Sequence, residues 1–126
     1  MALTDDILSE YGRGLGLPSL GFNDAGICSL RFDRLGDLFI ERLQDSLLVY
    51  LVRYHGRFET EALVAALAVG HWSNNPPFPV NAAVSGESAL MFSLTLSASE
   101  LNLPTVERAV SFLGRLHDSM QKGITA

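Results

Sequence analysis

The chain has 126 residues, a length that suits one domain with a single packed core and needs no metal or disulfide to stabilise it. Its formal net charge is −5 and its basic residues form no cluster, so it would repel a phosphate backbone and nucleic acid is not an expected partner. Hydrophobic residues make up 48% and charged residues 18%, which favours some apolar surface being left for a protein partner once the core is filled.

The location of the protein is also constrained by its sequence. Cys28 is the single cysteine, so no intramolecular disulfide can form, and a reducing cytoplasm fits best. No apolar run approaches the roughly 20 residues that a membrane span requires, and the acidic start of the chain is unlike a signal peptide. We therefore expect a cytoplasmic protein without a membrane partner.

The first predicted element is a short helix from residue 4 to about residue 17. Thr4 can cap it, and Asp5 and Asp6 stand where the helix dipole favours negative charge. Three glycines weaken its second half. Its apolar face consists of Ile7, Leu8, Tyr11 and Leu15, which recur at helical spacing.

Three strands are predicted next, at residues 26–33, 37–43 and 46–54, with only short turns between them. The first alternates between two faces, which is typical of a strand with one face buried and the other in water. One of its faces carries Cys28, Leu30 and Phe32, and the other carries Ile27, Ser29 and Arg31. The third is nearly all apolar, so we expect it to be central and covered on both faces.

The rest of the chain predicts two helices and two strands. Residues 59–72 form an apolar helix with almost no polar side, residues 80–97 a hairpin that turns at 85–88, and residues 104 to about 121 a helix with a clear apolar stripe. The order is therefore α-β-β-β-α-β-β-α in a single domain, residues 1–126. This predicts an α+β fold, with a five-stranded antiparallel sheet and three helices.

The sequence shows no site for catalysis. His55, His71 and His117 lie far apart and have no ligand spacing, so neither a metal nor a cofactor is expected. The glycines at residues 12–16 do not follow a strand and lack the lysine of a phosphate-binding loop. The acidic residues around the first hairpin, Asp33, Asp37 and Glu41, could serve acid–base chemistry but are interpreted as solvated charges. We therefore expect no enzyme.

The order of elements, together with several local patterns, resembles the class I type III secretion chaperones, the family of the Tir chaperone. The likeness covers roughly residues 4 to 120. Its parts are the leading helix followed by LGLPSLGFNDAGICSLRFD, then LFIERL and LLVYLV, the apolar helix, the hairpin VNAAVSGESALMFSLTL and the last helix LPTVERAVSFLGRLHDSM. The resemblance rests on the sum of these motifs.

The resemblance implies a homodimeric chaperone of the bacterial cytoplasm that is not an enzyme and uses no ATP. Such proteins bind the N-terminal segment of a secreted effector in extended form and keep it soluble and ready for export. Exposed strand edges and apolar grooves suit this task, because backbone hydrogen bonds accept varied sequences while pockets select side chains.

The resemblance also implies two surfaces. The effector-binding residues are expected on the first helix and the first two strands: Ile7, Leu8, Tyr11, Leu15, Leu20, Phe22, Ile27, Leu30, Phe32, Leu38 and Ile40. The dimer interface is expected on the apolar helix and the fourth strand: Leu63, Leu67, His71, Trp72, Val80, Ala82 and Val84. On this basis an aspartate at Leu8 is expected to abolish effector binding and to leave the dimer intact.

Two other functions remain open from the sequence. In the first, the same fold binds a small regulatory protein and couples secretion to transcription. In the second, the chain is a small α+β enzyme or ligand-binding domain, which requires a polar pocket with perturbed ionisable groups.

Overall fold

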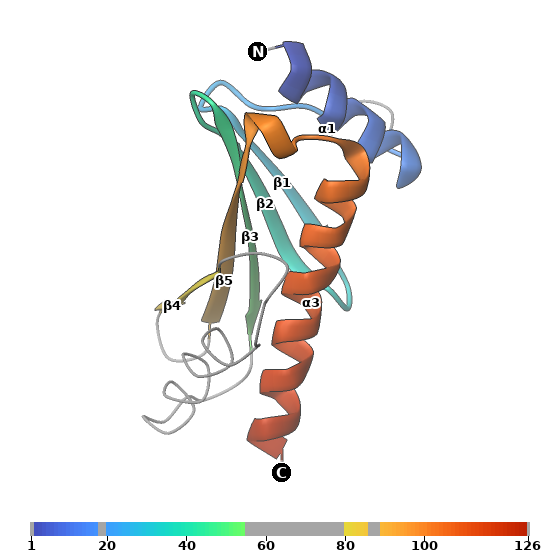
Figure 1. Ribbon diagram of the computed structural model, residues 1–126. Helices are drawn as coiled ribbons and strands as arrows, with labels where there is room; N and C mark the ends of the chain where they lie inside the picture. The colour runs from blue at the N-terminus through green and yellow to red at the C-terminus, as the bar shows by residue number, and fades with distance from the viewer. Residues whose placement is uncertain (1, 18–19, 55–79, 86–88, 126) are drawn as a thin grey trace.

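The computed structural model describes residues 2–17, 20–54, 80–85 and 89–125 (Figure 1). Their elements in chain order are α1 (Ala2–Gly14), β1 (Ile27–Phe32), β2 (Gly36–Arg42), β3 (Ser46–Tyr54), β4 (Asn81–Ser85), β5 (Ala89–Ser97), a 3-10 turn (Ala98–Glu100) and α3 (Leu103–Thr125). All five predicted strands and the first and last predicted helices are confirmed. The predicted helix at residues 59–72 lies outside the described residues.

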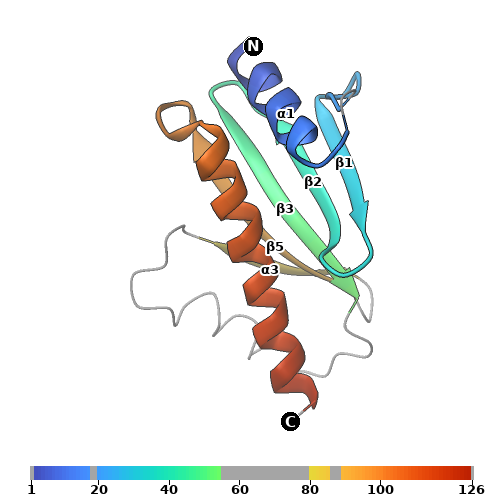
Figure 2. The ribbon, with the colours of Figure 1, turned by 90° about the vertical axis from the view of Figure 1, so that its right-hand side faces the viewer.

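The strands form one sheet in the order β1-β2-β3-β5-β4, and every neighbouring pair is antiparallel. Helices α1 and α3 lie on the same face of this sheet, as Figure 2 shows with the helices in front of the strands. We call the opposite side of the sheet the outer face. Among the described residues, the fold is thus a layer of two helices on a five-stranded sheet.

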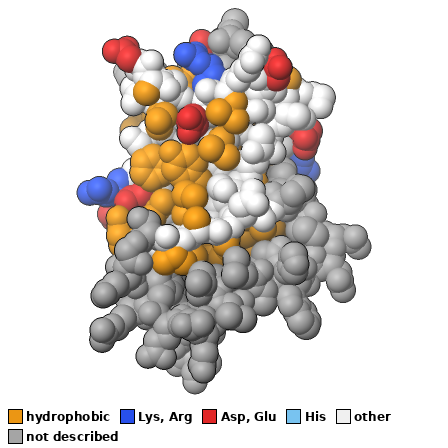
Figure 3. Space-filling model, turned by 90° about the vertical axis from the view of Figure 1, so that its left-hand side faces the viewer, with side chains coloured by type: hydrophobic (Ala, Val, Ile, Leu, Met, Phe, Trp, Pro, Cys, Tyr) orange, Lys and Arg blue, Asp and Glu red, His pale blue; other side chains and the backbone are white. Residues whose placement is uncertain are grey.

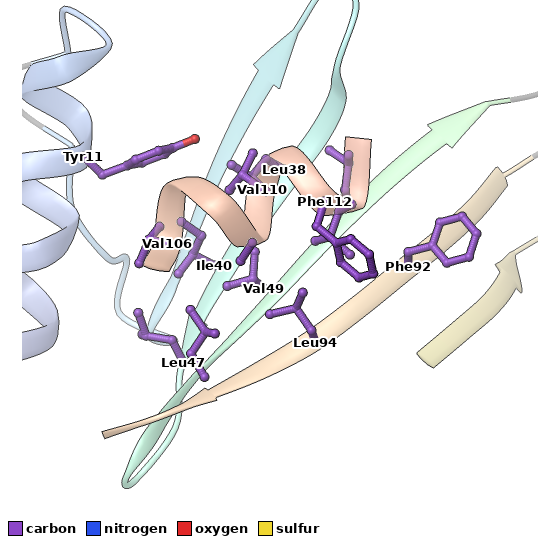
Figure 4. Close-up of a cluster of buried hydrophobic side chains, with 14 of the residues drawn as sticks. Tyr11, Leu38, Ile40, Leu47, Val49, Phe92, Leu94, Val106, Val110 and Phe112 are labelled. Atoms are coloured by element: carbon purple, nitrogen blue, oxygen red, sulfur yellow. The ribbon is translucent and has the colours of Figure 1, made fainter. Parts of the chain in front are cut away.

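The core lies between the helices and the sheet, where side chains from alternate strand positions meet the apolar stripes of both helices (Figure 4). The two helices contribute Ile7, Leu8 and Tyr11 of α1 and Val106, Ala109, Val110, Phe112, Leu113 and Leu116 of α3. The sheet contributes Cys28 of β1, Leu38 and Ile40 of β2, Leu47, Val49 and Leu51 of β3, and Leu90, Phe92, Leu94 and Leu96 of β5. Burial of this set is the main favourable term for folding.

Helix α3 is held at its start and again at His117. At its start, the side-chain oxygen of Asn102 accepts a 2.8 Å hydrogen bond from the backbone N–H of Thr105, as an N-cap residue does. Further along, His117 is fully buried, and its Nε2 lies 2.8 Å from the carbonyl oxygen of Leu51 in β3. The ring also packs edge-on against Phe92. These contacts attach the helix to the two central strands.

Helix α1 begins at Ala2 and ends at Gly14, so it starts and stops earlier than the sequence predicts. The early end follows from the way the chain turns back, because the N–H of Leu17 donates a 2.7 Å hydrogen bond to the carbonyl of Gly12. A Cβ at Gly12 would lie only 2.6 Å from the Leu17 carbonyl oxygen and from the Cβ of Leu20. Only glycine permits this close return.

The turn between β1 and β2 is fastened to the rest of the fold. The side chain of Leu35 packs against Gly114 of α3, where an added Cβ would lie 2.8 Å from Leu35 Cδ1. Arg53 of β3 donates hydrogen bonds of 3.1 and 2.9 Å to the Leu35 carbonyl, and it forms a 2.7 Å ion pair with Asp118 of α3. The hairpin is therefore held at a defined position beside β3 and α3.

Strand β3 is central, as predicted, but the expectation that both of its faces are covered is wrong for the part of the chain that the structure describes. Toward the helices, Leu47, Val49 and Leu51 are at most 1% exposed. On the outer face, Tyr50 and Val52 are only half-buried. The difference arises because α1 and α3 both pack on one side of the sheet.

Candidate functional site

The outer face carries a continuous apolar strip across the middle of the sheet. Its members, which we call the apolar strip, are Phe39 of β2, Tyr50 and Val52 of β3, Met91 of β5 and Ala83 of β4. Strand register places them side by side, because Phe39 pairs with Tyr50, and Val52 pairs with Met91, which pairs with Ala83. Figure 3 shows hydrophobic side chains gathered on this side of the molecule.

The strip is hollowed as well as apolar. The rings of Phe39 and Tyr50 stack with centroids 4.9 Å apart and an interplanar angle of 13°. Beside them lies a depression of about 350 Å³, lined by all five members of the strip and by Asp37, Tyr54, Val84 and Ala89. Burial, followed by the charge of Glu41, raises the pKa of the Tyr50 hydroxyl, which therefore stays neutral at physiological pH. This surface is suited to apolar side chains.

The edge of the sheet at β1 offers backbone hydrogen-bonding groups. The N–H of Arg42 donates to the carbonyl of Gly26, so Gly26 faces β2, and by the alternation of an antiparallel pair Cys28, Leu30 and Phe32 also bond to β2. The backbone groups of the intervening residues point outward. Those of Ile27 are occupied, because its N–H donates to Asn23 Oδ1 and its carbonyl accepts from the Asn23 N–H.

Ser29 and Arg31 are therefore the residues of β1 whose outward N–H and carbonyl groups are available to another strand. We call this pair the open edge. Exposed strand edges of this kind are templates for an added strand. Because the outward residues on a strand share one face, both side chains also lie on the outer face, next to the apolar strip.

A polar rim borders the strip at the turn between β1 and β2. A second depression, of about 500 Å³, is lined there by charged side chains that include Arg31, Asp33, Arg34 and Asp37. Arg31 Nε lies 3.3 Å from Asp37 Oδ1. The two depressions share Asp37, Val52 and Tyr54, so the apolar and the polar surfaces are continuous.

Three of the four effector-binding residues proposed on the first helix lie in the core. Ile7, Leu8 and Tyr11 are 5%, 2% and 7% exposed, because the apolar face of α1 packs onto the sheet and α3. Leu38 and Ile40 of β2 are at most 1% exposed for the same reason. We remove these five side chains from the candidate surface in this conformation. An aspartate at Leu8 is then expected to unfold the protein, so it does not test effector binding.

The remaining proposed residues keep some exposed surface. Leu15, just after α1, is 40% exposed, and Leu20, Phe22, Leu30 and Phe32 are partly buried against the core. The guanidinium of Arg42 lies 5.0 Å from the centroid of the Phe22 ring and also pairs with Asp5. Ile27 lies on the outer face and is half-buried. These six residues are retained as candidates.

Of the proposed dimer residues, Leu63, Leu67, His71 and Trp72 lie outside the described residues. Val80 and Ala82 pack partly against the core, and Val84 of the edge strand β4 is 37% exposed. Their role in a dimer stays a prediction.

The buried tyrosine of α1 leads to a test of the core packing. Burial, with smaller contributions from the charges of Glu107 and Cys28, raises the pKa of Tyr11 from 10.0 to about 12. Between these values the unfolded chain releases the proton while the folded chain retains it. The free energy of unfolding should therefore fall as the pH rises from 10 to 12, by on the order of 2 kcal/mol from this residue.

Chemical denaturation at a series of alkaline pH values measures this loss, and Tyr11→Phe should remove a large part of it. The same substitution at Tyr54, whose side chain is 66% exposed, is the control and should leave the loss in place. An unchanged pH dependence in Tyr11→Phe would contradict the placement of this hydroxyl.

Within the described part of the chain, no three His, Cys, Asp or Glu side chains come together as a metal site. In the same residues, no helix is long and apolar enough to cross a membrane.

Comparison with protein families gives a match over nearly the whole chain. The sequence model of the family described as type III secretory system chaperone SycN matches residues 3–121. The chain belongs to this family of type III secretion chaperones. Among curated proteins, none matches the chaperone significantly.

Solved structures share the fold of the chaperone. The HopA1–SchA chaperone–effector complex contains a chain with a TM-score of 0.74 and 16% identity, over 95% of this chain and 94% of that one. A chain of the ExsC–ExsE complex has a TM-score of 0.79 and 21% identity, over 96% of this chain and 92% of that one. The Yersinia pestis type III secretion chaperone SycH was solved with a stable fragment of YscM2. Its chain has a TM-score of 0.67 and 15% identity, over 92% of this chain and 95% of that one.

The apolar strip and the open edge contain residues that the sequence alone did not single out. Phe39, Tyr50, Val52 and Met91 occur in strands of correctly predicted position, but their pairing across the sheet was unknown. The alternation in 37–43, with Leu38 and Ile40 on one face and Phe39 on the other, was a signal that two apolar faces exist.

Proposed function

We propose that this chaperone binds the N-terminal segment of a type III secreted effector in extended form and keeps it soluble and competent for secretion. It acts in the bacterial cytoplasm as a homodimer, without ATP and without catalysing a reaction. We further propose that it is a class I chaperone, of the group to which the Tir chaperone belongs. The bound effector segment is called the client below.

The observation that carries this proposal is the continuity of the open edge with the apolar strip, in a chain of the type III secretion chaperone family. The edge supplies backbone donors and acceptors that need no particular client sequence. The strip supplies apolar contact area that a client side chain can cover. The two features together suit an extended, partly apolar polypeptide.

Co-expression with the products of neighbouring genes tests the function. We expect one of them to co-purify with the chaperone through its first residues, and those residues to become protected from proteolysis while remaining without a folded core. A partner that binds only as a folded domain would contradict the proposal. A small regulatory protein as the sole partner would support the regulatory alternative instead.

Light scattering tests the homodimer. We expect a mass twice that of the 13.7 kDa chain at micromolar concentration. A monomeric mass under these conditions would contradict this part of the proposal.

A further inference from the structure

We propose that the open edge selects clients by a pattern of two side chains, a large apolar residue opposite Ser29 and a carboxylate opposite Arg31. This inference rests on the proposed function and specifies the client chemistry. It requires that the client adds to β1 as a strand, so that its residues fall into register with the rows of the sheet.

The backbone fixes where such a strand can pair. Asn23 occupies the outward groups of Ile27, so the available donors and acceptors of β1 begin at Ser29 and continue to Arg31. Two client residues, separated by one, therefore lie directly opposite these positions. The side chains of both would point to the outer face, because paired residues in a sheet share a face.

Ser29 opens the way from the edge to the aromatic stack. It pairs with Phe39, which pairs with Tyr50, so all three belong to one row across the outer face. The serine side chain is small and exposed, and Phe39 beside it is only half-buried. A large apolar client residue opposite Ser29 can lean across it and cover this ring, as aromatic and long side chains do between strands.

Arg31 favours an anionic neighbour in the next row. Its side chain is 87% exposed, and its contact with Asp37 uses Nε, which leaves donors of the guanidinium available. Arg34 lines the same depression and is exposed. Arg53, in contrast, is already held by the Leu35 carbonyl and Asp118. A client carboxylate opposite Arg31 would therefore meet two accessible guanidinium groups, which it would share with Asp33 and Asp37 of the same depression.

The expected client pattern is thus a large apolar residue two positions away from Asp or Glu. If the client strand runs antiparallel to β1, the acidic residue comes first in the client sequence; if it runs parallel, the apolar residue comes first. The order found in bound peptides reports the direction of the added strand.

Selection from a phage-displayed library of random 12-residue peptides tests the pattern. The library is panned in parallel on the wild-type chaperone, on Arg31→Glu and on Arg115→Glu. Arg115 is an exposed arginine of α3, which lies on the face of the sheet opposite the outer face, and it receives the same change of charge. Thermal unfolding verifies that each variant is folded, which is expected at sites this exposed.

Wild type and Arg115→Glu should enrich peptides with the predicted spacing, whereas Arg31→Glu should replace the acidic position by Lys or Arg. A peptide selected on wild type should bind Arg31→Glu at least about tenfold more weakly. If wild type enriches peptides but Arg31→Glu enriches the same acidic ones, this inference is wrong and the proposed function stands. If wild type enriches no peptide, both fail.

Discussion

Replacing Phe39 by lysine should weaken client binding at least about 30-fold while the chaperone remains folded, an effect on the order of 2 kcal/mol. Phe39 forms the end of the apolar strip nearest the open edge, stacked on Tyr50, and is outside the buried core. A lysine there removes the apolar contact and leaves a charge that a client would have to desolvate. Isothermal titration with the co-purified client segment measures the change.

The matched control is Thr95→Lys. Thr95 is an exposed residue of β5 that pairs with Leu48, outside the apolar strip. The Thr95→Lys variant carries the same new side chain, also on an inner strand of the sheet, and should bind the client as wild type does. Equal losses in both variants would indicate a general effect of charge and would argue against the strip as the binding surface.

Gly36→Ala should lower the free energy of unfolding by at least about 3 kcal/mol, a fall of roughly 10 °C in the unfolding midpoint. Gly36 has a φ of +120°, a conformation that residues with a side chain rarely adopt. A Cβ at this position would also lie 2.5 Å from the backbone carbonyl oxygen of Val52, which cannot move without disturbing β3. Thermal and denaturant unfolding measure the loss.

Gly21→Ala is the control for this prediction. A Cβ at Gly21 would meet no atom within 4 Å. Its effect should be within about 1 kcal/mol of wild type and can be stabilising, because alanine reduces the entropy of the unfolded chain. A Gly36→Ala protein as stable as Gly21→Ala would show that the turn before β2 adjusts more freely than its contacts indicate.

The first strand shows how far local pattern predicts structure. Alternation placed Cys28, Leu30 and Phe32 on one face of β1, and the structure confirms this, with Cys28 buried and the other two packed against the core. Side chains alternate between the two faces of any strand, so the faces of β1 can be predicted without knowing which strand pairs with it. The open edge, in contrast, depends on β1 having β2 as its one neighbour in the described sheet.

The first helix shows the limit of the same reasoning. Ile7, Leu8, Tyr11 and Leu15 were predicted to form one apolar face that contacts an effector. The structure buries the first three against the sheet and α3, and it leaves Leu15 exposed just beyond the end of the helix. Periodicity identifies which side chains leave water together. It does not identify what covers them, because core and client are equally apolar.

The amino-acid sequence by itself determined the α+β class, the order and approximate bounds of the described elements, and the likeness to type III secretion chaperones, because these depend on local periodicity and on the sum of local patterns. Only the tertiary structure decided which apolar face is core and which is open. The row of Ser29, Phe39 and Tyr50 is made by residues from three strands, and its existence depends on cross-strand register, which no single segment contains.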